Sequence, residues 1–146
     1  MADIGNTSPR IAAVKDYFRR GDAGRPDMLE LFADDFQFYF PKFGIGRGKD
    51  DFMAFATGLV GSLNAIAHDI DAFSFIESGD KVVVEGTTHG EDNKGAQWQG
   101  GRTPGGRFCS VFQFEGALIA RMHIYLDPDY TSRDEEHFLW GKDRRW

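Results

Sequence analysis

The sequence predicts a single α+β domain in which three helices from the first half cover one face of a curved antiparallel sheet. Apolar residues recur at helical spacing up to about residue 63, and with a period of two from residue 65 onward. A length of 146 residues suits one hydrophobic core. We therefore expect one domain over residues 1–146, with helices within about 8–63, a strand meander over about 65–127 and a tail at 128–146.

Three segments have the signals of helices. Ser8 followed by Pro9 is typical of a first helical turn, and the apolar spacing that follows stops at Gly21. Pro26 can open a short second helix. The third helix follows a glycine-rich loop at 44–48, and its apolar positions are Phe52, Phe55, Ala56, Leu59 and Leu63.

Alternating segments predict the strands. Residues 36–40 alternate and are rich in aromatic side chains, which suit a pleated surface. The meander is predicted from alternation over 65–72, 82–88, 108–114 and 122–126, and sequential strands joined by short turns pair antiparallel. Seven glycines between 86 and 106 predict a long irregular loop that places Trp98 outside regular elements.

Composition excludes several classes of protein. The net charge of −6, from 17 Lys+Arg against 23 Asp+Glu, would repel a nucleic acid backbone. No apolar run approaches the ~20 residues needed to cross a bilayer. The single cysteine, Cys109, allows neither an internal disulfide nor a multi-thiolate metal site. With a polar N-terminus, these features predict a cytoplasmic protein without nucleic acid or membrane partners.

Aromatic residues form 14% of the chain, including 14 Phe. Such a stock of flat apolar surface in a small domain indicates either an aromatic core or an aromatic-lined cavity.

Several short segments, in order over about residues 8–130, resemble the nuclear-transport-factor-2-like superfamily in its SnoaL-like or ketosteroid-isomerase-like branch. They are residues 31–36 (LFADDF), 46–50 (GRGKD), 78–84 (SGDKVVV), 114–119 (FEGALI) and 125–128 (YLDP). The resemblance implies a sheet curled into a cone, closed by helices, whose interior binds a small, often polycyclic or terpenoid molecule. The glycines at 44, 46 and 48 do not form a dinucleotide-binding fingerprint, so we expect no cofactor.

The catalytic positions of that superfamily differ in this chain. The base of ketosteroid isomerases aligns with Phe40, their oxyanion-hole acid with Ser110, and their helix-one tyrosine falls near Val14. The acid of SnoaL-like cyclases aligns with Ile124. The resemblance therefore implies the fold and the cavity, but it does not identify the catalytic residues of this chain.

His68 and Ser110 are the two polar residues that we expect inside the cone. His68 lies between Ile66 and Ile70 on an apolar face, where it is either a general base or a core histidine bonded to a backbone carbonyl. Ser110 lies in a row of phenylalanines, where its hydroxyl either bonds a ligand oxygen or is satisfied within the core.

Three other features allow two interpretations each. Asp127 closes the last strand at the expected rim, where it acts on a substrate or starts a turn. Trp98 and Trp140 either cover a pocket or pack against a second subunit. His123, Tyr125 and Asp127 alternate on one strand, a spacing that fits a metal site or a polar or subunit-facing outer surface, and we favour the surface. His89 is a second-rank acid–base candidate.

We therefore expect a homodimer that binds a small hydrophobic, polyketide- or terpenoid-like molecule, and that acts as a cofactor-free isomerase, cyclase or dehydratase by proton transfer. The alternatives are a non-catalytic binding protein and a protein-interaction module. The expected catalytic residues are His68 and Asp127, with no metal ion. The expected ligand-binding residues are Tyr17, Phe40, Phe55, Thr88, Trp98, Phe108, Ser110, Phe112, Met122 and Ile124.

Overall fold

A computed structural model describes residues 7–127 of the chain. The predicted tail at 128–146, with Trp140, lies outside the described residues. The elements, in chain order, are α1 (Pro9–Asp22), the 3-10 helix η1 (Pro26–Leu31), β1 (Phe32–Phe40), β2 (Gly44–Arg47), α2 (Gly48–Ser62), β3 (Leu63–His68), the 3-10 turn η2 (Ile70–Ala72), β4 (Ser74–Ser78), β5 (Lys81–Asp92), β6 (Gln97–Gln99), β7 (Arg107–Glu115) and β8 (Leu118–Leu126).

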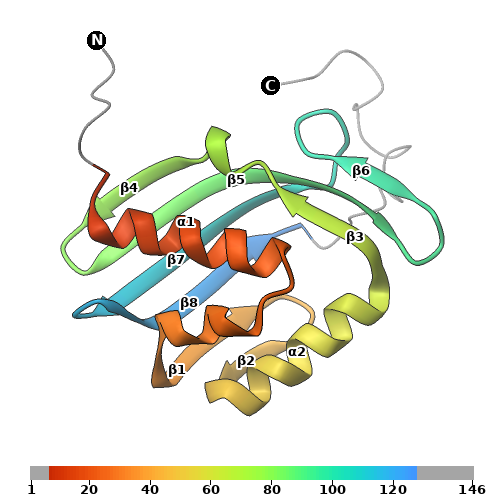
Figure 1. The fold of residues 1–146 in the computed structure, drawn as a ribbon. Coiled ribbons are helices and arrows are strands. Elements are labelled where there is room, and N and C mark those ends of the chain that lie inside the picture. Colours follow the sequence, from red (N-terminus) through yellow and green to blue (C-terminus); the bar gives the residue numbers. More distant parts are fainter. Residues whose placement is uncertain (1–6, 128–146) are drawn as a thin grey trace, which may run out of the picture.

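The fold is α+β, as predicted: α1, η1 and α2 lie in front of one curved sheet (Figure 1). The strand order is β2-β1-β8-β7-β5-β3, with β4 and β6 also paired to β5. The meander from β5 to β8 is antiparallel, whereas β1 pairs with β8 in parallel, so the sheet as a whole is mixed. No short turn joins β1 to β8, and the direction of that pair is therefore not fixed by a hairpin.

The predicted helices form at their expected places. The Ser8 hydroxyl caps α1 by accepting a hydrogen bond from the Ile11 backbone N at 3.1 Å. Val14, Tyr17 and Phe18 form the buried face of α1. The segment 44–48 was expected to form a glycine-rich loop. Its first four residues, Gly44–Arg47, instead form β2, which pairs with β1.

The strand predicted over 65–72 is interrupted, which corrects the sequence interpretation. It ends at His68, and Ile70 and Ala72 belong to η2. β4 then follows, and β3 and β4 pair with the two halves of the long strand β5. A Cβ at Gly86, between those halves, would lie 2.5 Å from the Phe73 ring, so glycine allows the bend to pack closely. The alternation of apolar residues continues through residues 65–72, so the sequence pattern gives no sign of the bend.

Trp98 was expected outside regular structure, and that prediction is wrong. Trp98 lies in β6, opposite Gly90 of β5, and is 2% exposed. A Cβ at Gly90 would lie 2.6 Å from the indole ring, so this glycine makes room for Trp98. The indole N–H donates to the Thr88 hydroxyl at 3.0 Å. The glycines thus build a close-packed hairpin.

Within residues 7–127, no helix is both long and apolar enough to cross a membrane.

Candidate functional site

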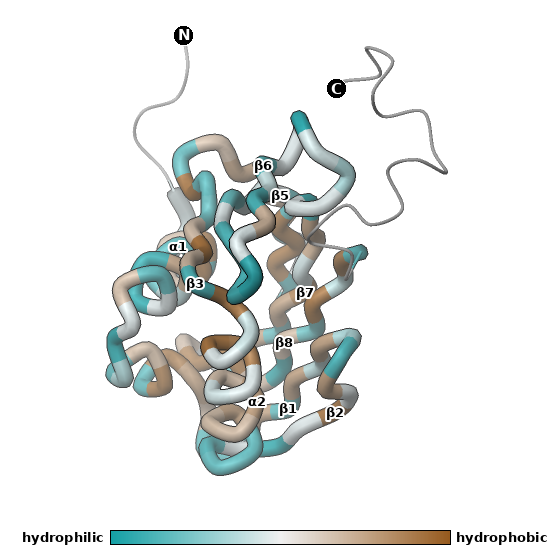
Figure 2. Tube along the Cα trace, turned by 90° about the vertical axis from the view of Figure 1, so that its right-hand side faces the viewer, coloured by the Kyte–Doolittle hydropathy of each residue, from teal (hydrophilic) through white to brown (hydrophobic). Residues whose placement is uncertain are grey.

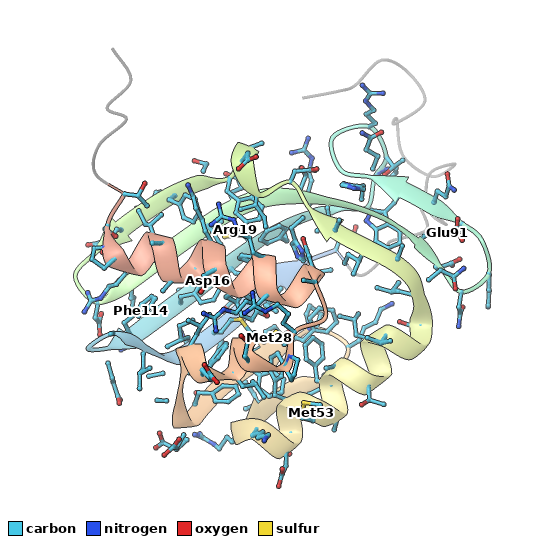
Figure 3. All side chains as sticks on the ribbon, in the orientation of Figure 1. Asp16, Arg19, Met28, Met53, Glu91 and Phe114 are labelled. Atoms are coloured by element: carbon cyan, nitrogen blue, oxygen red, sulfur yellow. The ribbon has the colours of Figure 1, made fainter. Side chains whose placement is uncertain are left out.

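A cavity of about 500 Å³ lies between the helices and the sheet, within the range of about 300–1,000 Å³ that is usual for ligand pockets. Its walls come from the end of α1, η1, α2, β3 and the inward faces of β1, β5, β7 and β8. Met28 of η1, one of the lining residues, lies beneath α1 in Figure 3. The hollow interior expected from the sequence is therefore present.

The structure brings most of the predicted site residues to this cavity. The lining includes His68, Tyr17, Phe40, Phe55, Thr88, Phe108, Ser110 and Ile124. Phe112 and Met122 are fully buried in the core and do not line it. Trp98 does not line it either: it lies in β6, opposite Gly90 of β5. Asp127 is exposed after the end of β8, away from the lining.

His68 is paired with Asp22 in the cavity wall. The Nδ1 atom of His68 lies 2.6 Å from Oδ1 of Asp22, and the backbone N–H of His68 donates to Oδ2 at 2.8 Å. Asp22 ends α1 and His68 ends β3, so the two elements place the pair. The side chains are 20% and 21% exposed, and both residues line the cavity.

This contact determines the chemistry of the imidazole. A carboxylate is an acceptor, so the short bond places a proton on Nδ1 of His68. In a neutral ring, Nε2 then carries the lone pair and can accept a proton. An aspartate that orients a histidine in this way is a common arrangement around a general base.

Aromatic side chains surround the imidazole. Its ring centroid is 4.7 Å from that of Phe18 and 5.4 Å from that of Phe108. These rings exclude water from one side of His68 and offer a flat apolar surface to a ligand.

Tyr17 supplies a second polar group beside the pair. Burial raises the pKa of its hydroxyl above the ordinary value, and the negative charge of Asp22 raises it further. Both effects disfavour the tyrosinate. The Tyr17 hydroxyl therefore keeps its proton over the whole physiological pH range and is a hydrogen-bond donor.

Ser110 stands on the cavity floor without a hydrogen-bond partner. It is 1% exposed, and among residues 7–127 its Oγ contacts no donor or acceptor. On β7 it faces Val84 of β5 and Ile124 of β8, which are both apolar. A buried hydroxyl is nearly always satisfied, so the Ser110 hydroxyl is placed to form a hydrogen bond with a polar group inside the cavity.

Sequence reasoning missed Asp22. One signal was available, because an acidic residue in the last turn of a helix opposes the helix dipole. Arg19 and Arg20, in the same turn, have the favourable sign. An unfavourably placed carboxylate suggests a partner elsewhere in the chain.

A second His–Asp pair lies outside the cavity. Asp69 accepts from the Thr87 hydroxyl at 2.6 Å and lies 3.1 Å from Nδ1 of His89. The His89 side chain is 51% exposed. Within the described part of the chain, no group of three or more His, Cys, Asp or Glu residues is arranged to hold a metal ion.

The chain belongs to the SnoaL-like domain family, whose profile matches residues 12–122. A search among curated proteins gives no match.

Solved structures share this fold at low sequence identity. An NTF2-like protein of unknown function from Burkholderia pseudomallei is 22% identical, with a TM-score of 0.72 over 83% of this chain and 92% of that one. TerC, co-crystallised with polyporic acid, is 22% identical, with a TM-score of 0.71 over 82% and 92%. A putative polyketide cyclase from Pseudomonas putida is 17% identical, with a TM-score of 0.71 over 87% and 97%. These likenesses establish the fold of the chain.

Proposed function

We propose that this protein binds a small, largely apolar ring compound in its cavity and transfers a proton on it, with His68 as general base. The observation that carries the proposal is the 2.6 Å contact between Asp22 and His68 in the wall of an aromatic cavity. The solved structures that resemble this chain include putative polyketide cyclases, which supports a ligand of the polyketide type.

The proposed step needs no group beyond the chain and its ligand. Nε2 of His68 accepts a proton from a carbon next to a ligand carbonyl, and the electron pair of the C–H bond moves toward the carbonyl oxygen to give an enolate. Asp22 stabilises the imidazolium that forms. Ser110 donates a hydrogen bond to a ligand oxygen. The Nε2 proton then returns to a different carbon of the ligand, which completes an isomerisation. In a cyclisation, the enolate carbon instead attacks a second carbonyl carbon of the ligand, and the Nε2 proton goes to the alkoxide oxygen that forms.

Deuterium incorporation tests this step. The ketone 2-tetralone, two fused rings with acidic C–H bonds beside a carbonyl, is incubated with the protein in D₂O and followed by proton NMR. The wild-type protein should speed the exchange above the buffer rate, and His68→Gln should return it to that rate with the melting temperature nearly unchanged. His89→Gln is the matched control, because it removes the histidine of the exposed pair. Equal rates for wild type and His68→Gln would refute the role of His68.

A binding protein without catalysis is the second candidate, and the predominantly apolar lining favours it. It predicts that 2-tetralone binds to the wild-type protein and to His68→Gln with similar affinity, and that neither accelerates exchange.

We further propose that two chains associate through the outer face of the sheet. A row of side chains crosses that face in register from β4 to β1: Ile76, Val83, Val111, His123 and Tyr39. Ile76 is 67% exposed, although it is apolar. Sedimentation analysis should give a dimer for the wild-type protein and a monomer for Ile76→Lys. A wild-type monomer at high concentration would contradict this proposal.

A further inference from the structure

The two ends of α2 are held very differently. Its first half is anchored by Phe52 and Phe55, which are buried and whose rings lie 5.4 and 5.6 Å from that of Phe38. In its second half, residues 56–62, no side chain is buried. This half nevertheless forms part of the cavity wall, through Ala56, Leu59 and Val60.

Two glycines in this second half have no steric reason to be glycine. A Cβ at Gly58 or at Gly61 would meet no heavy atom within 4 Å, and neither residue has a positive φ. Glycine in a helix interior favours the unfolded backbone relative to alanine. In addition, the Thr57 hydroxyl donates to the Met53 carbonyl, and that of Ser62 to the Leu59 carbonyl, each at 2.8 Å. Such bonds bend and slightly weaken a helix.

The cavity wall formed by α1 and η1 is held by several polar contacts. Arg20 of α1 donates to the Asp27 carbonyl of η1 at 2.9 Å and forms an ion pair with Asp16 at 2.7 Å. Asp22, next to this network, is held by His68 through two hydrogen bonds. A cavity with one fixed wall and one weakly packed wall opens on the weak side.

Val60 indicates where that opening leads. It lines the cavity and is also 73% exposed, so the cavity reaches the protein surface beside the second half of α2. Figure 2 shows that α2 is neutral to hydrophobic after its charged start, so an apolar ligand meets no charged barrier there.

We propose that residues 56–62 of α2 are the gate of the cavity, and that Gly58 and Gly61 keep it flexible enough for a ligand to enter and leave. The gate opens by local unwinding of this half-helix, while the half that holds Phe52 and Phe55 stays in place. The proposal rests on the cavity being a ligand site, and it does not depend on proton transfer by His68.

Hydrogen exchange of the ligand-free protein tests the gate directly. Amides of residues 57–62 should exchange faster than those of α1, and the double variant Gly58→Ala/Gly61→Ala should slow them about fivefold to thirtyfold, as two helical glycine-to-alanine changes predict. Protection of 57–62 equal to that of α1 in the wild-type protein would overturn the proposal.

Stopped-flow fluorescence with 2-naphthol supplies the second readout. In the double variant, the association and dissociation rate constants should fall by the same factor, with an unchanged Kd, because the gate alters the path and leaves the bound state intact. Ala54→Gly is the matched control: the site is exposed, lies in the anchored half and does not line the cavity. It should lower the melting temperature and leave both rate constants unchanged.

The outcomes separate this proposal from the proposed function. Unchanged rate constants in the double variant, or an equal change in Ala54→Gly, would overturn the gate even if His68→Gln abolished deuterium exchange. Slower association and dissociation of 2-naphthol, together with slower hydrogen exchange of amides 57–62, would support the gate even if His68→Gln had no effect.

Discussion

Asp22 and His68 join the end of α1 to the end of β3, because one carboxylate accepts both the imidazole Nδ1–H and the backbone N–H of His68, at 2.6 and 2.8 Å. One contact thus closes the cavity wall and fixes the tautomer of the imidazole. The two roles can be separated by substitution.

Asp22→Asn keeps the size of the side chain and removes its charge. An amide can donate to Nδ1, which would move the imidazole proton to Nε2, and the imidazolium would lose its counter-charge. We expect 2-tetralone exchange to fall on the order of 10²-fold. ¹⁵N NMR of the His68 ring should show the protonated nitrogen change from Nδ1 to Nε2. An unchanged ring spectrum would contradict the assigned tautomer.

Ser110→Ala should separate stability from binding. The Ser110 hydroxyl has no partner within residues 7–127, so its removal should leave the free energy of unfolding unchanged or raise it by up to ~1 kcal/mol. Affinity for 2-tetralone should fall about threefold to tenfold, the value of one neutral hydrogen bond. The parent hydrocarbon tetralin, which lacks the oxygen, should bind both proteins equally. A similar loss for tetralin would show that the hydroxyl affects packing alone.

His123 predicts a dependence of stability on pH. Burial lowers the pKa of this histidine below its ordinary value of 6.5, and the nearby Arg121 charge lowers it further. The unfolded chain therefore binds a proton more readily than the folded one, so stability is full above pH 6.5 and falls as the pH drops below it. In urea unfolding between pH 5 and 8, His123→Phe should show a smaller loss at acidic pH than the wild-type protein. Parallel curves would contradict the buried, neutral imidazole.

Trp98→Phe tests the packing of the β5–β6 hairpin. The change removes the indole N–H that donates to Thr88, and it leaves a smaller ring in a buried site. We expect a loss of about 1–3 kcal/mol in the free energy of unfolding from the bond and the lost volume. Urea denaturation measures it. A loss below ~0.5 kcal/mol would mean that Trp98 is not part of the core.

The helices and the meander could be predicted because their signals are local. Ser8 and Pro9 mark the start of α1, and alternation marks β7 and β8. The bend at η2 was missed, because it depends on Phe73, just after η2, packing against Gly86 of β5, a contact between residues 13 positions apart in the sequence. The placement of Trp98 failed for the same reason, since its glycine-rich surroundings resemble a loop until Gly90 is seen opposite it.

The site was only half predictable. His68 and Ser110 could be proposed because each is a polar residue on an apolar strand face. Asp22 is 46 positions from His68, and only the packing of α1 against β3 brings them together. Phe112 and Met122 share strand faces with lining residues such as Ser110 and Ile124, yet they pack in the core. Which part of a strand face borders the cavity depends on how the helices pack against the sheet.

A crystal structure of the protein with 2-tetralone bound tests the central claim most directly. The account predicts the rings of the ketone inside the cavity, against Phe108, with a carbon beside the carbonyl facing Nε2 of His68 and the Asp22 contact intact. The carbonyl oxygen should lie within hydrogen-bonding distance of the Ser110 or Tyr17 hydroxyl. A ketone bound outside the cavity, or inside it with Nε2 turned away, would contradict the account.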